Sequence, residues 1–180
     1  MSHLSVPISR EDHIEGPANA PMTLVEYGDF ECSYCGETYP VIKAVQETMG
    51  PRLRFVFRHF PLARLHPHAV HAAEIAEAAG EIDRFWQMHD ILFQNQTALD
   101  DADLLADAKA VGLTLDAVKR ALAGRYADHL KRDFRGGVRS GVNGTPCLFV
   151  NGTRFDGPRD VETIVAALEA TGPNRSGLDS

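Results

Sequence analysis

The sequence predicts an α/β protein built from a βαβ unit, an all-helical block and a ββα unit. Two apolar runs rich in β-branched residues, near residues 22–27 and 53–58, flank a helical pattern, and two more follow residue 146. Residues 66–140 carry helical periodicity with no strand signal. A length of 180 residues suits one domain, or one domain with a large insertion.

Composition narrows the class of protein. A hydrophobic fraction of 44% is sufficient for a core that needs no disulfide framework. A net charge of −7 and a pI near 5.6 argue against a nucleic-acid partner, which usually requires a basic surface. No run approaches the roughly 20 apolar residues of a membrane span. We therefore expect neither a nucleic-acid partner nor a membrane span.

Residues 1–20 are expected to form an N-terminal arm, because prolines and a glycine interrupt them and no periodicity is present. The arm contains no apolar block, so it does not resemble a signal peptide. If Met1 is the native start, we expect a cytoplasmic protein, and an exported one if a leader was trimmed.

Residues 21–63 contain the predicted βαβ unit. A strand over 22–27 ends at Gly28-Asp29, and a helix follows from Ser33. Pro40 lies inside the helical pattern and predicts a kink there. The second strand, 53–58, closes the unit, whose crossover is expected to be right-handed.

Residues 64–140 form the predicted helical insertion. The first helix is expected to start at His66-Pro67 and to end at Gly80. Thr114 is a candidate N-cap for the fourth helix. Apolar spacing predicts the remaining helices near residues 85–93, 104–111 and 126–138.

Residues 141–172 contain the predicted ββα unit. Asn151-Gly152 between two apolar runs is a strong hairpin signal. Asp160 is expected to cap a final helix, and residues 173–180 are expected to be a flexible tail.

The segment FECSYCG carries two cysteines, Cys32 and Cys35, separated by two residues. Such a pair can be half of a zinc site, a structural disulfide or a redox pair. Zinc usually takes four ligands, and the chain offers only Cys147 besides, with no second pair. A permanent disulfide is unusual in the cytoplasm. These considerations favour a redox pair.

The position of the pair predicts its chemistry. Cys32 follows a buried strand at the start of a helix, where free N–H groups and the helix dipole stabilise a thiolate. Cysteine pKa values in such positions fall to about 3.5–7.5. Cys35 lies one turn further on the same side, with a more buried sulfur. We therefore expect Cys32 to attack a disulfide and Cys35 to resolve the mixed disulfide.

Several motifs together resemble the DsbA-like thiol–disulfide oxidoreductases. These are Glu26 six positions before the cysteine pair, a helical insertion, and Gly-Thr-Pro before a hairpin and terminal helix. The segments GPANAPMTLVEYGDFECSYC and FRHFPLARLHPHA are similar to a bacterial branch of this family. The resemblance covers roughly residues 12–170. It implies a thioredoxin fold interrupted by a helical domain.

The resemblance also implies roles for individual residues. Cys32 corresponds to the nucleophile and Cys35 to the resolving cysteine. Pro146 corresponds to a cis-proline facing the pair, with Thr145 offering its backbone to an extended substrate. Glu26 corresponds to a buried acid that moves a proton to or from the resolving thiol. From the strand pattern alone, Glu26 could equally be an edge acid pointing to solvent.

The dipeptide between the cysteines, Ser33-Tyr34, departs from the Pro-His of strongly oxidising family members. We assign both residues, with Thr145 and Pro146, to the substrate-binding surface. Because the histidine is missing, we expect a weaker oxidant, or a reductant.

The predicted function is thiol–disulfide exchange with protein or peptide thiols, with a redox partner that resets the cysteines. No organic cofactor and no metal are required, because electrons pass through the cysteines. One alternative is a redox-inert, chaperone-like binding module. Another is a glutathione-transferase or isomerase relative, although such relatives have lost the paired cysteines.

Other polar residues receive structural interpretations. His66, His68 and His71 are interpreted as a polar helix start rather than a metal site. His59 is expected to be packed or exposed rather than catalytic. Cys147 is interpreted as a small buried strand residue, with a third redox thiol that exchanges with Cys35 as the alternative.

Overall fold

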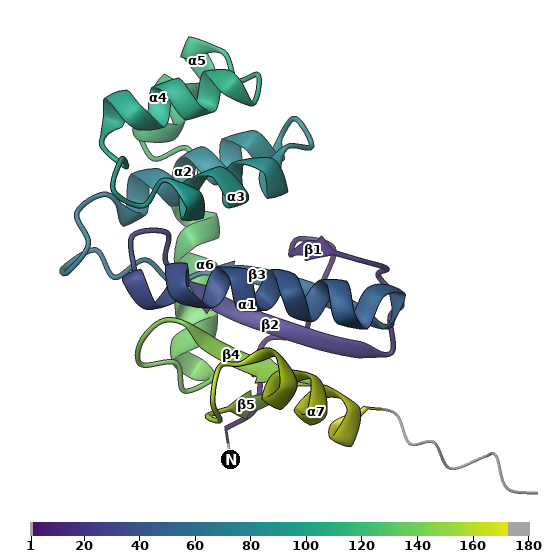
Figure 1. Cartoon of the computed structure of the whole chain (residues 1–180). Helices are drawn as coiled ribbons and strands as arrows, with labels where there is room; N and C mark the ends of the chain where they lie inside the picture. Colours follow the sequence, from purple (N-terminus) through teal and green to yellow (C-terminus); the bar gives the residue numbers. More distant parts are fainter. Residues whose placement is uncertain (1, 173–180) are drawn as a thin grey trace, which may run out of the picture.

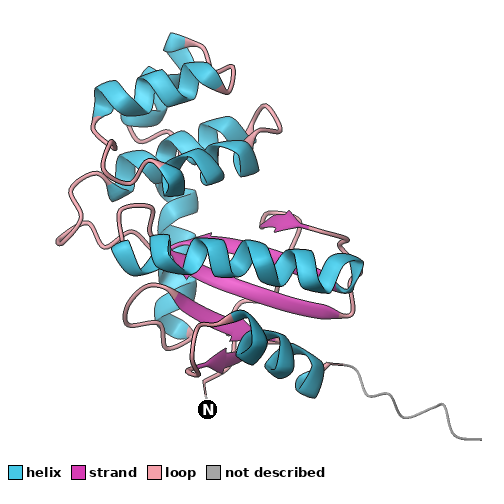
Figure 2. Ribbon diagram, in the orientation of Figure 1, coloured by secondary structure: helices cyan, strands magenta, loops and turns pink. Residues whose placement is uncertain are grey.

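The computed structural model describes residues 2–172, and the predicted tail at 173–180 lies outside the described residues. These residues form five strands and seven α-helices, and all of them except β1 follow the predicted order (Figures 1 and 2). The strands are β1 (His13–Glu15), β2 (Met22–Gly28), β3 (Leu53–His59), β4 (Cys147–Val150) and β5 (Thr153–Phe155). The helices are α1 (Ser33–Met49), α2 (Ala69–Gly80), α3 (Phe85–Gln94), α4 (Asp101–Ala110), α5 (Leu115–Leu122), α6 (Ala127–Arg139) and α7 (Val161–Thr171), with a short 3-10 turn, η1 (Gly50–Arg52), after α1.

The strands form one mixed sheet in the order β1-β3-β2-β4-β5. β2 and β3 are parallel, as the βαβ unit requires, and the other neighbouring pairs are antiparallel. The α/β fold with a βαβ unit, a helical insertion and a ββα unit is therefore confirmed.

The helices form layers on both faces of the sheet. α1 and α7 pack on one face, and α6 crosses the other face behind the sheet (Figure 1). α2, α3, α4 and α5 stack as a block beyond the β1–β3 edge of the sheet (Figure 1). The last helix of the predicted insertion thus covers the sheet itself, because Phe134 of α6 stacks on Phe60 beside β3 with ring centroids 4.2 Å apart.

The central strand β2 is buried on both faces, and its side chains alternate between two apolar clusters. Leu24 belongs to the larger cluster, which includes α1 and the helical block. Val25 and Tyr27 belong to the smaller cluster, which includes Phe134 of α6. By this alternation Glu26 faces α1.

The start of α2 differs from the prediction. α2 begins at Ala69 rather than His66, and its last residue is Gly80. α1 continues through Pro40 as one helix, so this proline does not end it, and the kink stays a prediction. Two predicted caps are confirmed, since Thr114 accepts a hydrogen bond from the Ala117 N–H and Asp160 accepts one from the Thr163 N–H.

The arm is more ordered than its composition predicts. β1 lies within it and pairs with β3. Its three residues are too few to show a periodic pattern in the sequence. The guanidinium of Arg58, on β3, donates to both carboxylate oxygens of Asp12 at 2.7 and 3.0 Å. It also donates to the carbonyls of Val6 and Pro7. The arm is therefore held against the α6 face of the sheet.

Candidate functional site

The cysteine turn connects β2 to α1. Cys32 is the N-cap of α1, with an extended backbone at φ −73° and ψ 120°. Its carbonyl accepts a hydrogen bond from the Gly36 N–H at 3.1 Å, which starts the helix. The N–H groups of the first turn remain available near the Cys32 sulfur. The predicted strand, cysteine turn and helix are therefore all present.

The two sulfurs differ in accessibility and in acidity. Both residues are free thiols, and 4% of Cys32 but 0% of Cys35 is exposed. A hydrogen bond with the Cys35 thiol lowers the pKa of Cys32 to about 5, against the opposing effect of burial. Burial, followed by the hydrogen bond with Cys32 and the charge of Glu26, raises the pKa of Cys35 well above 9. At neutral pH Cys32 is a thiolate and Cys35 a thiol.

The loop before β4 lies opposite the cysteine turn. Antiparallel pairing of Tyr27 on β2 with Cys147 on β4 brings the end of one strand beside the start of the other. The Cys32 sulfur lies 3.4 Å from the Thr145 carbonyl oxygen. The Thr145–Pro146 peptide bond is cis, as the resemblance implies. Residues 113 positions apart thus share one site.

Glu26 is a buried acid in the central strand, so its interpretation as a solvent-facing edge acid is wrong. Its Oε1 atom has no hydrogen-bond partner among the described residues. Burial, and then the negative charge of Cys32, raises the pKa of Glu26 to about 8, against a lowering by Arg159. The carboxyl group can therefore gain or lose a proton near neutral pH.

Ser33 and Tyr34 occupy the exposed first turn of α1, and 61% of Tyr34 is accessible. An aromatic side chain this exposed beside a buried thiol offers a contact surface for a bound molecule.

Gln96, between α3 and α4, is a site residue that the sequence does not reveal. Its Nε2 atom donates to the carbonyls of Phe30 and Cys32, both at 2.8 Å. A Cβ atom on Gly36 would lie only 1.9 Å from the Gln96 side-chain oxygen, so a larger residue here would displace the Gln96 amide. The glycine directly after the second cysteine was the only sequence signal for this close approach.

Asp29 and His66 form a second unpredicted contact to the turn. The Asp29 carboxylate accepts hydrogen bonds from the N–H groups of Glu31 and Leu62 and contacts His66 Nδ1, each at 2.8 Å. Burial lowers the pKa of His66, but the hydrogen bond to Asp29 and the charges of Asp29 and Cys32 raise it overall. His66 lies in the loop before α2. A positive charge on its ring would favour the Cys32 thiolate.

The other histidines of HPHAVH do not converge with His66. His71 Nδ1 contacts Asp101 at 2.6 Å, and the backbone N–H of His68 donates to Glu31. His59, at the end of β3, is packed as expected, and its ring contacts Glu77.

Cys147 and Cys35 lie on opposite faces of the sheet. Cys147 belongs to the apolar cluster beside α6, and Cys35 to the cluster beside α1. Burial is the main cause that raises the pKa of Cys147. The structure thus favours a buried strand residue over a third redox thiol.

No helix within residues 2–172 has both the length and the apolar character needed to cross a lipid bilayer.

A family model described as thioredoxin matches residues 9–170. Among solved structures, BdbD from Bacillus subtilis superposes with a TM-score of 0.81 at 21% identity, covering 93% of this chain and 98% of BdbD. A thioredoxin-like oxidoreductase from Silicibacter pomeroyi superposes with a TM-score of 0.80 at 22% identity, covering 90% of this chain and 92% of that one. These likenesses show a thioredoxin-like fold with the helical insertion.

A curated relative is much longer than this chain. The Na⁺/H⁺ antiporter NhaA 1 of Salinispora arenicola is 46% identical over 167 residues. The match covers 92% of this chain and 26% of the relative, so the chain spans about a quarter of that protein's length.

Proposed function

Since the chain belongs to the thioredoxin family, we propose that it is a thiol–disulfide oxidoreductase acting on protein or peptide thiols through Cys32 and Cys35. One observation carries the proposal: the pKa of one thiol is lowered and the pKa of the other is raised. Cys32 has a pKa near 5, whereas the pKa of Cys35 lies well above 9. A thiolate at the helix start with a protonated thiol behind it supplies an attacking and a resolving group.

The exchange proceeds in two displacements. The Cys32 thiolate attacks one sulfur of a substrate disulfide, forming a mixed disulfide and releasing the other substrate sulfur as a thiolate. Cys35 then loses its proton and attacks the Cys32 sulfur. This step forms the Cys32–Cys35 disulfide and releases the second substrate thiolate. Two electrons pass from the cysteine pair to the substrate, and the reverse path oxidises a substrate dithiol.

Glu26 acts in the second displacement. Its ionised form accepts the proton of Cys35, either directly or through water, as that thiol becomes a nucleophile. The pKa near 8 supports this role, because such a group exchanges protons readily at neutral pH. No organic cofactor is needed, because the cysteines carry the electrons.

The substrate chain lies across the cis-proline loop in this proposal. Pro146 shapes the loop, and the Thr145 backbone pairs with an extended segment of the substrate. Ser33 and the exposed Tyr34 contact the same substrate segment in this proposal. A separate redox protein resets the cysteines after each cycle.

We propose a reduction potential between those of thioredoxin and DsbA, about −270 and −120 mV respectively. The Cys32 pKa near 5 lies between the values of about 7 and 3.5 for those proteins. His66, whose pKa is raised overall by its contact with Asp29, is a basic side chain near the turn, whereas the Ser33-Tyr34 dipeptide has none. Equilibration with glutathione measures the potential, and a value near −120 mV would contradict the proposal.

Insulin reduction tests the activity. Wild-type protein with dithiothreitol should accelerate insulin precipitation, and Cys32→Ser should abolish the acceleration. Cys147→Ser, which removes a thiol from the opposite face of the sheet, should retain it. If the wild-type protein neither reduces insulin nor oxidises a reduced peptide, the proposal is wrong. The alternative of a redox-inert binding module would then be favoured.

Ion antiport forms no part of the proposal. The antiporter name belongs to a protein of which this chain spans 26%.

A further inference from the structure

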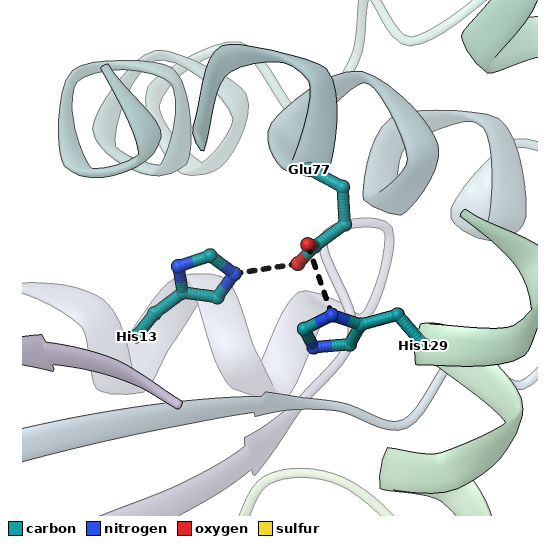
Figure 3. A group of neighbouring side chains, drawn as sticks. All are labelled: His13, Glu77 and His129. Carbon is teal, nitrogen blue, oxygen red and sulfur yellow. Dashed lines mark hydrogen bonds and ion pairs between the residues drawn. The ribbon is translucent and has the colours of Figure 1, made fainter. Parts of the chain in front are cut away.

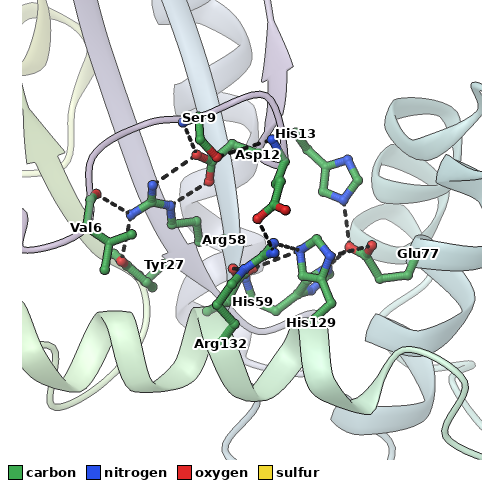
Figure 4. A network of polar contacts seen from close by, with 12 residues as sticks. Val6, Ser9, Asp12, His13, Tyr27, Arg58, His59, Glu77, His129 and Arg132 are labelled. Carbon is green, nitrogen blue, oxygen red and sulfur yellow. Dashed lines mark hydrogen bonds and ion pairs between the residues drawn. The ribbon is translucent and has the colours of Figure 1, made fainter.

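Three histidines surround one buried carboxylate between the arm, the sheet and the helical block. His13 comes from β1, His59 from β3, Glu77 from α2 and His129 from α6 (Figures 3 and 4). Glu77 Oε1 lies 2.6 Å from His13 Nε2 and 2.7 Å from His59 Nε2. Glu77 Oε2 lies 3.2 Å from His129 Nδ1. The redox mechanism uses none of these residues.

The cluster is buried but remains reachable from solvent. Only 6% of the Glu77 side chain is exposed, whereas 17% of His13 and 21% of His129 are exposed. Figure 3 shows both histidine rings pointing toward the Glu77 carboxylate. The two rings are therefore the part of the cluster that solvent contacts most.

Neighbouring residues fix the orientation of both rings. His13 stacks in parallel on Phe85, with ring centroids 3.5 Å apart. The second nitrogen of His129, Nε2, lies 3.5 Å from an oxygen of Asp133. A carboxylate behind a histidine, on the nitrogen remote from the ligating one, is the usual outer partner of a metal-binding imidazole.

We propose that His13 Nε2, His129 Nδ1 and the Glu77 carboxylate bind a divalent transition metal, with Zn²⁺ the best match. One ligand atom from each residue lies within 4.8 Å of the others. Imidazole and carboxylate ligands suit zinc, which also accepts three protein ligands plus water. His59 keeps its hydrogen bond to the remaining Glu77 oxygen and so orients the carboxylate.

Metal binding requires specific changes in the positions of these ligand atoms and of Arg132. Zinc bonds of about 2.0–2.1 Å in a tetrahedron place ligand atoms about 3.3 Å apart. The contact of 2.6 Å between His13 and Glu77 is a hydrogen bond, so its proton must leave and the two atoms must separate slightly. Arg132, which lies 3.2 Å from His129 Nε2, must turn away so that this nitrogen can donate to Asp133. Arg132 is largely at the surface and can do so.

The charges are balanced in the metal-bound form. Two neutral imidazoles and the Glu77 carboxylate reduce the charge of the dication to +1, and nearby Asp133 offsets the remainder. The metal would join β1 to α2 and α6, and therefore hold the arm against the helical block.

The test uses Zn²⁺ and a protein with Cys32→Ser and Cys35→Ser, which removes competing thiolates. Titration against a chromophoric chelator should give one Zn²⁺ per chain, and bound Zn²⁺ should raise the melting temperature. His13→Gln and His129→Gln, which keep polar side chains, should weaken binding at least about tenfold, the lower limit for loss of even an outer-shell partner.

His71→Gln is the matched control, because His71 is an exposed histidine paired with Asp101. It should leave the stoichiometry and affinity unchanged. Co²⁺ should give the intense visible absorption of a tetrahedral site in the parent and lose it in His129→Gln. Circular dichroism verifies that each variant is folded. The absence of Zn²⁺ binding by the folded parent, or equal binding by His13→Gln and His129→Gln, would overturn the proposal.

Discussion

The two faces of the central sheet differ in how far their buried charged side chains are hydrogen-bonded. On the α1 face, Glu26 has a carboxylate oxygen with no hydrogen-bond partner among the described residues. On the α6 face, the buried guanidinium of Arg58 donates to Asp12, to the Tyr27 hydroxyl and to two arm carbonyls. Both groups are almost inaccessible to solvent.

This difference separates a functional role from a structural one. A buried charge without a partner destabilises the fold and shifts its pKa, which leaves it ready to exchange a proton. A buried charge with all its donors paired holds neighbouring segments together instead. Glu26 therefore belongs to the chemistry, and Arg58 to the attachment of the arm.

The largest expected effect separates the cysteines on the two faces. Cys35→Ser should eliminate insulin reduction and accumulate a mixed disulfide through Cys32, because no thiol remains to resolve it. Mass spectrometry under non-reducing conditions identifies the adduct. Cys147→Ser should turn over like wild type. A Cys35→Ser protein that still turns over, with Cys147 linked to Cys32, would reverse the roles assigned to the two faces.

The next effect concerns stability on the α6 face. Asp12→Ala should lower the free energy of unfolding by about 3–5 kcal/mol, because it leaves Arg58 charged and buried. Urea denaturation measures the change. Glu11→Ala, at an exposed neighbour paired with Arg132, is the control and should change stability by about 0.5 kcal/mol or less. Equal losses in both variants would show that the arm tolerates an unpaired Arg58.

Glu26→Gln should raise the stability of the protein, whereas Asp12→Ala lowers it, and it should also lower the activity. The folded-state pKa of Glu26, near 8, exceeds its ordinary value of 4.5, so its stabilising contribution is complete below pH 4.5 and is lost as pH rises through 8. In a Cys32→Ser background the charge of Cys32 is removed, but burial, the largest cause, still raises this pKa. Glu26→Gln should therefore be more stable than its parent at pH 8 by about 2 kcal/mol. Urea denaturation should show this advantage shrinking toward pH 5.

With both cysteines present, Glu26→Gln should slow insulin reduction by about a hundredfold, since general acid–base catalysis typically contributes this much or more. Glu26 would have no part in the mechanism if this variant reduced insulin at the wild-type rate and if its stability differed from that of its parent by the same amount at every pH.

The smallest effect concerns the contact between the helical block and the cysteine turn. Gln96→Ala should cost about 1–2 kcal/mol, because it removes two hydrogen bonds to buried carbonyls. Chemical denaturation measures the cost. Gln94→Ala is the matched control, since Gln94 is exposed and, within residues 2–172, its side chain forms a hydrogen bond only with Tyr39. Indistinguishable stabilities of the two variants would show that the block does not support the turn.

Local patterns in the sequence were sufficient for the order of the elements after residue 21 and for the reactive pair. Turn residues such as Asn151-Gly152, caps such as Asp160, and the short apolar runs act between neighbours along the chain, so their physical meaning is readable from spacing. The position of Cys32 between a strand and a helix likewise requires only adjacent residues. Its partners Glu26, Thr145 and Pro146 came from the family resemblance.

Only the tertiary structure determined which distant side chains meet. β1 is too short to show a period, and its pairing depends on the exposed edge of β3. Gln96, Asp29 and His66 reach the cysteine turn through loops, whose paths no periodicity encodes. The cluster around Glu77 joins four segments that are separate in sequence. Burial, the main cause that raises the pKa of Glu26, arises only when these segments pack together, and therefore the strand pattern alone could not predict it.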